Sequence, residues 1–578
     1  MKRASLVSLG MLIISTLYVT SGFQLAIFPG FEYTTPYNLK DVFAESYIGH
    51  DPINIRNDTD FKSQADSEGW EGNGTLSFPY VIESYTIISG VEYSIQITDV
   101  SSYFVIRNCI FTNSFRGSYG VRLENATYGH LFDCEVSKQV YGVYVYESPG
   151  LAIDNVTVWD CNDTGLYITY SAGCSITACN VTDSDINIAI DNSPSCEVIN
   201  NVIYGSLNGP GLGVTYSGLT IVSQNQIYDN SENGVWLTNS DNCILTNNMI
   251  YNNTIHGLYS ETSDFVEVNA NEIWGNGWYP TESLSNGIHT ESCDYWTILG
   301  NQIWNNTESG VFLMSSEYGN IVSNVVFDNN FTGIFSDHSL SQFISDNIAY
   351  RNEIGIYSTD MNARIIDNIV FDNVFGIGML GSSTCWVHSN DIGWNFDDNA
   401  YDVGGFDNNW YMNWYSDFSG QGNYTITQPD VFDMYPSKSL EINSSTPQEY
   451  NYGTSGNRIF FPAQALNPKE YEVYVNDNLL YHKTWDGTDI EIDVDGFDVG
   501  NYEITVAVYH VSGHSTNATS ALYVLAPTTT APTIPTTTSP ITQPPPDGIN
   551  LIIVVIGGGA IAVVIIIVVL MRRRLSQD

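Results

Sequence analysis

Positive charge is scarce in this sequence. Lysine and arginine make up only 18 of the 578 residues, against 64 aspartates and glutamates, and the formal net charge is −46. A protein that binds nucleic acid needs cations to neutralise the phosphates, so this composition argues strongly against that class of function. A solvated acidic surface explains the charge most simply, and cation binding or a salty medium is the alternative.

Motifs for transition metals are missing as well. The nine histidines and nine methionines are scattered, and the chain has no His-x-x-His, Cys-x-x-Cys or methionine-rich grouping of the kind that holds copper or zinc. Nine cysteines is an odd number. We therefore expect no complete disulfide framework, and some buried, unreactive thiols instead.

The amino-terminal end indicates export. Lys2 and Arg3 precede an apolar stretch that ends in small residues, which is the layout of a secretory signal peptide over residues 1–22. An uncleaved amino-terminal anchor is the alternative. Twelve Asn-x-Ser/Thr sequons follow in the rest of the chain. They are acceptor motifs for N-glycosylation and suit an extracellular glycoprotein.

The carboxyl-terminal end indicates a membrane anchor. Residues 549–571 are mainly apolar and contain a run long enough to cross a bilayer as a helix. Arginines begin the tail at residues 572–578, so the tail is expected in the cytoplasm and the large amino-terminal part outside. The Thr/Pro-rich residues 527–548 are typical of an extended stalk. We predict a single-pass protein of the cell membrane.

The main part of the chain is a repeat of about 22 residues. Each repeat carries a glycine, or Asn187 in its place, followed directly by an aliphatic residue that must face a core. The period is too short for helices and lacks the leucine density of leucine-rich repeats, so it predicts an all-β fold, a parallel β-helix of about twelve or more turns. The repeated glycines are Gly120, Gly142, Gly165, Gly213, Gly234, Gly257, Gly287, Gly310, Gly333, Gly355 and Gly376.

Asparagines recur at two positions of the repeat. An asparagine at a bend can bond its own turn and the turns beside it, so we interpret both rows as structural ladders rather than ligand sites, with the glycine letting the chain bend. The first row includes Asn225, Asn248, Asn271, Asn301, Asn324, Asn347 and Asn368. The second is Asn230, Asn253, Asn276, Asn306, Asn329, Asn352, Asn373 and Asn395.

These repeats, such as "IVSNVVFDNNFTGIF" (321–335), resemble the right-handed parallel β-helix superfamily shared by pectate-lyase-like and NosD-like proteins, over about residues 50–436. Residues 58–87 resemble the entry segment of archaeal surface β-helix proteins, and residues 408–436 the closing segment of NosD-like chains. NosD is associated with copper delivery, which we do not expect here because the copper motifs are missing.

The resemblance and the composition together predict the domain order. Residues 23–76 are expected to form an amino-terminal segment and cap, and residues 77–436 the β-helix with its closing segment. Residues 437–526 alternate apolar and polar side chains with period two and resemble an immunoglobulin-like β-sandwich. We expect this sandwich to be a spacer or binding module. The full order is similar to that of archaeal cell-surface proteins.

An outward row of rings and carboxylates is the predicted ligand site. Side chains alternate along a strand, so the second residue after each glycine should point outward. Rings at a spacing of roughly 5 Å suit stacking on sugars, and a stabilising stripe is the alternative. The candidates are Trp236, Tyr259, His289, Phe312, Phe335, Tyr357 and Asp337. A second row, from Tyr204 to Phe371, is interpreted as packing.

Two acidic sets are candidates for chemistry. Glu261 and Glu291 stand one turn apart and are the first candidates for a catalytic pair, although the signatures of polygalacturonases are missing. A row of four acidic residues suits Ca²⁺, the only cofactor we consider, or else exposed turn carboxylates. That row is Asp241, Asp264, Asp294 and Glu317.

Three functions remain open from the sequence. The first is a non-enzymatic, membrane-anchored surface protein that binds glycan or another cell-surface component. The second is a membrane-tethered polysaccharide hydrolase or lyase that uses the outward carboxylates. The third is a structural spacer of the cell envelope, which needs no site.

Overall fold

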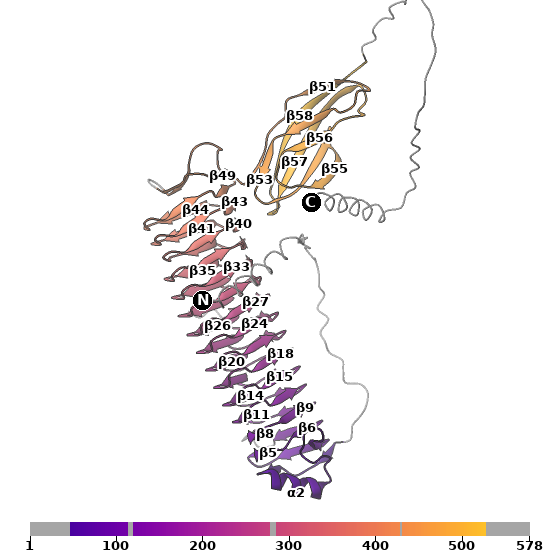
Figure 1. Cartoon of the computed structure of the whole chain (residues 1–578), viewed down its shortest axis with the longest axis vertical. Coiled ribbons are helices and arrows are strands. Elements are labelled where there is room, and N and C mark those ends of the chain that lie inside the picture. Colours follow the sequence, from indigo (N-terminus) through magenta and orange to yellow (C-terminus); the bar gives the residue numbers. More distant parts are fainter. Residues whose placement is uncertain (1–46, 114–118, 278–284, 428–430, 528–578) are drawn as a thin grey trace, which may run out of the picture.

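The computed structural model of the chain describes residues 47–113, 119–277, 285–427 and 431–527. The predicted signal peptide, membrane span and tail lie outside these residues, as does the predicted stalk beyond its first residue. Within the described residues no helix is long and apolar enough to cross a membrane. Figure 1 shows a rod of stacked strands with one helix at its amino-terminal end and a separate group of strands beyond the other end.

The rod consists of three parallel β-sheets that the chain visits in turn. We call them sheets 1, 2 and 3 because they contain β1, β2 and β3, and they have 17, 15 and 15 strands. One turn runs through sheet 3, then sheet 1, then sheet 2, and each strand pairs in parallel with its counterpart in the next turn, as Val311 does with Ile334. The predicted parallel β coil is confirmed, with about 15 turns.

The strand bounds are as follows. Sheet 1 contains β1 (Ile48–Gly49), β4 (Tyr85–Ser89), β7 (Ile110–Asn113), β10 (Glu135–Ser137), β13 (Thr157–Trp159), β16 (Asn180–Thr182), β19 (Val202–Tyr204), β22 (Gln226–Tyr228), β25 (Met249–Tyr251), β28 (Glu272–Trp274), β31 (Gln302–Trp304), β34 (Val325–Phe327), β37 (Ile348–Tyr350), β40 (Ile369–Phe371), β43 (Asp391–Gly393), β46 (Trp414–Tyr415) and β49 (Ser437–Lys438). Sheet 2 contains β2 (Ile53–Ile55), β5 (Tyr93–Val100), β8 (Tyr119–Ala126), β11 (Tyr141–Tyr146), β14 (Thr164–Thr169), β17 (Ile186–Asp191), β20 (Leu212–Thr215), β23 (Val235–Thr238), β26 (Leu258–Glu261), β29 (Ile288–Glu291), β32 (Val311–Met314), β35 (Thr332–Asp337), β38 (Ile354–Ser358), β41 (Phe375–Leu380) and β44 (Asp398–Val403). Sheet 3 contains β3 (Tyr80–Glu83), β6 (Phe104–Arg107), β9 (Gly129–Phe132), β12 (Ala152–Asp154), β15 (Ser175–Thr177), β18 (Glu197–Ile199), β21 (Ile221–Ser223), β24 (Ile244–Thr246), β27 (Glu267–Asn269), β30 (Thr297–Leu299), β33 (Asn320–Val322), β36 (Phe343–Ser345), β39 (Arg364–Ile366), β42 (Trp386–His388) and β45 (Asn409–Tyr411).

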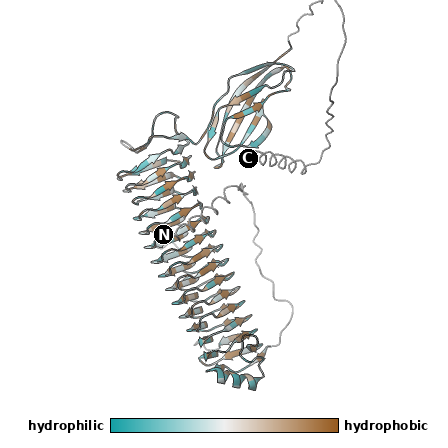
Figure 2. Cartoon of the chain, viewed as in Figure 1, coloured by the Kyte–Doolittle hydropathy of each residue, from teal (hydrophilic) through white to brown (hydrophobic). Residues whose placement is uncertain are grey.

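Aliphatic side chains fill the rod. The residue after the repeated glycine points inward, and Val121, Val143, Ile288 and Ile334 are all fully buried. Figure 2 shows the consequence as hydrophobic strands stacked along the rod. All nine cysteines lie in the described part, and all are buried and free of disulfides, so they act as small core side chains.

The corners between sheets are made by residues with left-handed backbone conformations. Ser323 and Asp328, for example, stand at either end of β34 with φ angles of 56° and 54°. Gly333 does not make a bend, because it lies within β35. A Cβ atom on it would be 2.5 Å from the carbonyl oxygen of Gly355 in the next turn. The repeated glycine is therefore required by the close approach of two strands.

The strand pairing also corrects one repeat. The pairing of β17 with β20 makes Gly211, rather than Gly213, the counterpart of Asn187. Gly213 lies two residues further on, opposite Trp236 of the next strand. Asn187 replaces a glycine because its buried amide finds a partner inside the corner, where Nδ2 donates to Oδ1 of Asn230 (3.1 Å).

The first asparagine row forms a continuous hydrogen-bonded ladder. Oδ1 of Asn324 accepts from the backbone nitrogen and from Nδ2 of Asn301, both at 2.9 Å. Nδ2 of Asn324 donates to Oδ1 of Asn347 (3.0 Å) and to the carbonyl oxygen of Ile298 (2.8 Å), so its amide is fully satisfied. The ladder also includes Asn201, Asn225, Asn248, Asn271, Asn368, Asn390 and Asn413.

Both ladders end on carboxylates. The backbone nitrogen and Nδ2 of Asn413 donate to Oδ2 of Asp433, each at 2.9 Å. The second row runs in the same way to Asn395 and Asn399, whose Nδ2 donates to Oδ1 of Asp417 (2.7 Å). Every amide of a ladder donates toward the carboxyl-terminal end, so the last partner must be an acceptor.

The two ends of the rod are covered. At one end lies α2 (Asp58–Glu68), whose buried Phe61 stacks on Tyr80 with ring centroids 4.6 Å apart. At the other end lies the hairpin of β47 (Tyr424–Thr427) and β48 (Val431–Asp433), where the ring of Tyr424 stacks on Tyr415 at 3.7 Å. These covers shield the last strands from pairing with other chains.

The carboxyl-terminal strands have a core of their own, which includes Trp485, Val506 and Leu522. Their classification as an immunoglobulin-like sandwich stays a prediction. Five of them form one sheet in the order β51 (Gln448–Asn451), β58 (Ser515–Leu525), β57 (Gly500–His510), β54 (Pro468–Val475) and β55 (Asn478–Thr484). The others pair as β50 (Leu440–Ile442) with β53 (Ala463–Ala465) and β52 (Arg458–Phe461) with β56 (Ile490–Asp493).

A small polar joint connects this unit to sheet 1. Nε2 of His510 lies 2.7 Å from Oδ2 of Asp391, and both side chains are almost fully buried. Nε2 of His514 lies 2.7 Å from Oδ1 of Asp372. The ring of Trp394 stacks on His514 with centroids 4.5 Å apart. The joint thus combines two histidine–aspartate contacts with one indole.

Candidate functional site

The outer face of sheet 2 carries three rows of side chains in its middle turns. The central row is Trp236, Tyr259, His289, Phe312, Phe335 and Tyr357, which are partners in the strand register. On one side lies the covered row, Asn233, His256, Asn286 and Ser309. On the other side lie the carboxylates of Glu261, Glu291 and Asp337. The sequence-predicted ligand residues are therefore brought together on one face.

The rings at the amino-terminal end of the central row are tilted against one another, whereas Phe312 and Phe335 further along are stacked at 24°. Trp236 and Tyr259 meet at 70°, and Tyr259 and His289 at 81°. The second aromatic row, on sheet 1, is different because its neighbouring rings are parallel, with angles of 2 to 6° from Tyr204 to Phe371. Parallel rings hide their faces in one another, whereas tilted rings leave faces for other partners.

Exposure differs along the central row. Trp236 is 36 % exposed, and Tyr259, Phe335 and Tyr357 are half-buried. His289 and Phe312 are only 9 % and 6 % exposed. All six lie on the outer face of the sheet, but the covered row and the neighbouring rings bury these two. The accessible rings therefore lie at the two ends of the row.

The covered row explains why the middle is buried. It is a third kind of ladder, in which each side chain accepts from the backbone of the next turn: Oδ1 of Asn233 from His256 (3.1 Å), Nδ1 of His256 from Asn286 (3.0 Å) and Oδ1 of Asn286 from Ser309 (3.0 Å). Burial lowers the pKa of His256 well below its usual value. The sequence analysis missed this row, whose signal was a polar residue directly before the repeated glycine in four consecutive turns.

His289 is a neutral side chain in this setting. Its Nδ1 lies 3.3 Å from Nδ2 of Asn286, whose Oδ1 is already an acceptor, so Nδ1 accepts and Nε2 carries the proton. Nε2 is buried without a partner in the described part of the chain. Burial lowers the pKa of His289 to about 4. The rings of His289 and Tyr259 meet edge to face, with centroids 5.3 Å apart. In such a contact the imidazole N–H can face the aromatic ring.

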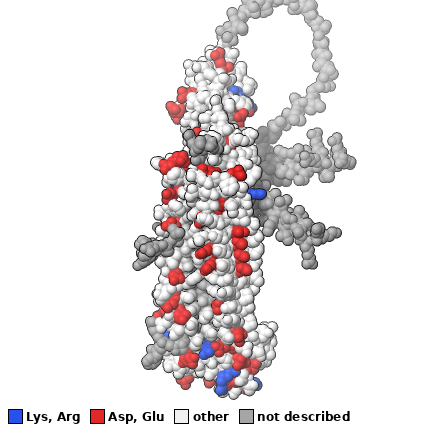
Figure 3. All heavy atoms as spheres, turned by 90° about the vertical axis from the view of Figure 1, so that its left-hand side faces the viewer, with Lys and Arg blue, Asp and Glu red and all other residues white. Residues whose placement is uncertain are grey.

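Glu261 and Glu291 stand side by side on adjacent strands. The hydroxyl of Tyr259 donates to Oε2 of Glu291 (3.1 Å), and burial followed by this contact raises the pKa of the tyrosine. The only lysine or arginine between Lys138 and Arg364 is Arg351, and it pairs with Asp328 instead. Figure 3, which faces the side where the sheet 2 strands are labelled in Figure 1, shows acidic patches along the rod and few basic ones.

In the predicted calcium row, carboxylate oxygens accept hydrogen bonds from the backbone of the next turn. Oδ1 of Asp241 accepts the backbone N–H of Asp264 (2.9 Å), Oδ1 of Asp264 that of Asp294 (2.8 Å), and Oδ1 of Asp294 that of Glu317 (2.8 Å). In the described part of the chain no three histidine, cysteine or acidic side chains group as a metal site. The row therefore works as a fourth ladder, and bound calcium stays a prediction.

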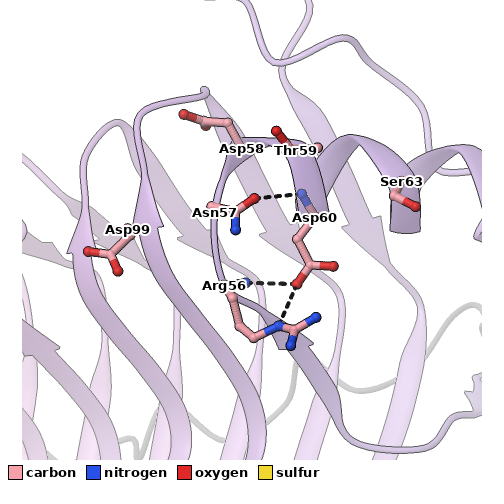
Figure 4. A pocket seen from close by; sticks show the side chains of 7 residues that line it. All are labelled: Arg56, Asn57, Asp58, Thr59, Asp60, Ser63 and Asp99. Carbon is pink, nitrogen blue, oxygen red and sulfur yellow. Dashed lines mark hydrogen bonds and ion pairs between the residues drawn. The ribbon is translucent and has the colours of Figure 1, made fainter.

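A hollow of about 640 Å³ lies beside the start of α2. Figure 4 shows that its polar side chains bond one another: Nε of Arg56 donates to Oδ2 of Asp60 (3.0 Å), and Oδ1 of Asn57 accepts the backbone N–H of Asp60 (2.9 Å). Asp58 receives the backbone N–H of Ser101 (3.0 Å). Asn57 is the cap of the helix, and these internal contacts account for the polar lining.

Comparison with protein families matches two stretches of the rod. Residues 119–289 match the family described as right handed beta helix region. The rod is a right-handed β-helix. Residues 279–426 match the family described as periplasmic copper-binding protein (NosD). The fold expected from the resemblance is thus confirmed, and a comparison with curated proteins found no match.

Solved structures with a similar fold include three polysaccharide- or oligosaccharide-processing proteins. The mannuronan C-5 epimerase AlgE6 A-module of Azotobacter vinelandii is 14 % identical, with 62 % of this chain and 99 % of that chain covered and a TM-score of 0.36. The periplasmic alginate epimerase AlgG is 12 % identical (63 % and 83 %, TM-score 0.30). The DFA-IIIase of Arthrobacter chlorophenolicus A6 without its lid is 11 % identical (53 % and 89 %, TM-score 0.31). These likenesses concern the fold of the β-helix alone.

Proposed function

We propose that this chain is a membrane-anchored, extracellular β-helix protein that binds glycans of a cell surface through the outer face of sheet 2. One observation carries the proposal: Trp236 is 36 % exposed and meets Tyr259 at 70°, beside the adjacent carboxylates of Glu261 and Glu291. Tilted, accessible rings pack on the C–H faces of sugars, and carboxylates accept hydrogen bonds from sugar hydroxyls.

The charge of this face selects the glycan. Glu261, Glu291 and Asp337 lie on it, and the nearest arginine in sequence, Arg351, is occupied by Asp328. An acidic polysaccharide would bring more carboxylates to a surface that already repels them. The proposed ligand is therefore an uncharged glycan. The predicted stalk and membrane span would hold the binding face of sheet 2 outside the cell, where such glycans occur.

A glycan array tests this proposal. The ectodomain is compared with Trp236→Ala, and with Trp386→Ala as a matched control, since Trp386 is 48 % exposed but lies on sheet 3. We expect binding to neutral glycans that Trp236→Ala weakens at least tenfold and Trp386→Ala leaves unchanged. Equal loss in both variants, or no neutral glycan bound, would overturn the proposal and leave the predicted role of a structural spacer.

A second candidate function is glycan cleavage. Glu261 and Glu291 are register partners on adjacent strands, so their backbones are about 4.8 Å apart. Side chains on neighbouring strands can bring two carboxyl groups to the separation that a retaining pair needs. If they act on the bound glycan, the wild type releases reducing ends over hours, and Glu261→Gln and Glu291→Gln stop the release but still bind. Binding without any product in the wild type contradicts this second function.

A further inference from the structure

A second hollow lies at the corner where the chain passes from sheet 1 to sheet 2. Its volume is about 900 Å³, and six consecutive turns line it from Asn252 to Val374. Adjacent turns are about 4.8 Å apart, so this corner groove extends roughly 24 Å along the rod. Its lining includes Asn252, Asn305, Asp328, Asn330, Arg351 and Glu353.

The groove presents amides to solvent. The side chains of Asn305 and Asn330 are exposed, and neither forms a hydrogen bond within the described part of the chain. Beneath them, Asn306 and Asn329 belong to the second ladder and are held by it, with Nδ2 of Asn306 donating to Oδ1 of Asn329 (2.9 Å). The hydrogen-bonded amides of Asn306 and Asn329 thus lie next to the unbonded side-chain amides of Asn305 and Asn330. Each unbonded amide offers both donors and an acceptor.

Arg351 lies in the lining of the groove, and its positive charge is paired with Asp328. Its Nε donates to Oδ1 of Asp328 and its Nη2 to Oδ2, both at 2.6 Å. The guanidinium lies over the ring of Tyr350, 4.6 Å from its centroid. Glu353 adds one more carboxylate to the lining, so the groove has no excess cation with which to attract an anion.

An aromatic border runs beside these amides. Asn252, Asn305 and Arg351 each follow directly after a ring of the parallel row on sheet 1, and Trp304 is one of those rings. The rings are half-buried, so they offer edges rather than faces. Amides that bond hydroxyls beside an apolar border are the composition of a carbohydrate subsite.

We propose that the corner groove is a second subsite for an uncharged, hydroxyl-rich oligosaccharide. This inference rests on the proposed function, because the same class of ligand would occupy both sites. Asn252, Asn305 and Asn330 also begin sequons. A glycan attached to any of them would fill the groove, so the subsite belongs to the protein in its unglycosylated form.

Calorimetry with matched variants tests the subsite. The full chain, made in a host without N-glycosylation and held in nanodiscs, is titrated with cellohexaose, mannohexaose and an acidic mannuronate hexamer. The test variant combines Asn305→Gly with Asn330→Ala; glycine suits the φ of 56° at Asn305, where Gly275 stands in an earlier turn. The control is Asn247→Gly, an exposed asparagine with a φ of 55° at another corner.

We expect the double variant to bind a neutral hexaose at least tenfold more weakly than the wild type, and the control variant to bind it with unchanged affinity. The mannuronate hexamer should not bind to any of them. Unchanged binding in the double variant overturns the subsite. If Trp236→Ala then abolishes binding, the proposed function stands and only the subsite is wrong. If neither the double variant nor Trp236→Ala matters, or if no neutral hexaose binds, both proposals are wrong.

Discussion

Asp360 has an environment that differs from that of its counterparts in neighbouring turns. At the equivalent position of two earlier turns stand serines, Ser316 and Ser339. Their hydroxyls accept the backbone N–H of the preceding turn. Oδ1 of Asp360 takes over this role for Ser339 (3.0 Å), while Oδ2 is buried without a partner in the described residues. Burial raises the pKa of this carboxyl to about 6.

This shift makes a prediction about pH. Between the ordinary pKa of 3.8 and about 6, the folded chain keeps the proton on Asp360 and the unfolded chain loses it. The free energy of unfolding should therefore fall by about 3 kcal/mol as pH rises through this window, and this contribution should stay flat above it. Asp360→Asn removes the contribution, so the variant gains stability relative to wild type between pH 4 and pH 6.

Urea unfolding at pH 4.5 and pH 7 measures this difference. Asp241→Asn is the control, because Asp241 is exposed and also accepts a backbone N–H from the next turn. A stability difference between Asp360→Asn and wild type that does not change with pH would show that Asp360 ionises normally.

At the scale of the elements, the ladders hold neighbouring turns together. Asn324→Ala removes the acceptor of two donors on Asn301 and the donor to Asn347, and buried groups left without partners cost 1 to 3 kcal/mol each. We expect a loss of about 3 kcal/mol or more in the free energy of unfolding. Asn320→Ala, at an exposed position of β33, should cost less than about 0.5 kcal/mol, and equal losses in the two variants would contradict the ladder.

The periodic elements were the ones that sequence could predict. A residue such as Ile334 reads as core because its aliphatic type recurs in every turn, and the same holds for the rows of Asn324 and Asn329. The predicted role of Gly333, to let the chain bend, was wrong. The close approach of the next turn, which requires the glycine, depends on strand pairing and not on composition. The covered row of His256 and Asn286 was missed because its members share polarity but not residue type.

At the scale of the whole molecule, the joint sets how the carboxyl-terminal unit sits on the rod. The backbone N–H of Ser512 donates to Nδ1 of His510 (3.1 Å), so Nε2 carries the proton that bonds Asp391. Asn467 donates to the same carboxylate oxygen (2.8 Å). Sequence analysis could not find these partners, because Asp391 and His510 are 119 residues apart and belong to no repeat.

We predict that His510→Ala loosens this joint. The change leaves the buried carboxylate of Asp391 with one partner fewer and opens space beside Trp394, so the two units should move more freely. Small-angle scattering of the ectodomain should then show a larger radius of gyration and a broader distance distribution. His482→Ala, at an exposed position of β55, should leave the scattering curve unchanged; an unchanged curve for His510→Ala would mean that the joint does not fix the units.

Hydroxyl-radical footprinting shows whether the outer face of sheet 2 binds an uncharged glycan. The ectodomain is oxidised with and without saturating cellohexaose or mannohexaose, and modification is read at Trp236, Tyr259 and Trp386. We expect the glycan to protect Trp236 and Tyr259, while oxidation of Trp386 on sheet 3 stays the same. Protection of Trp386 alone, or of none of the three, would contradict it.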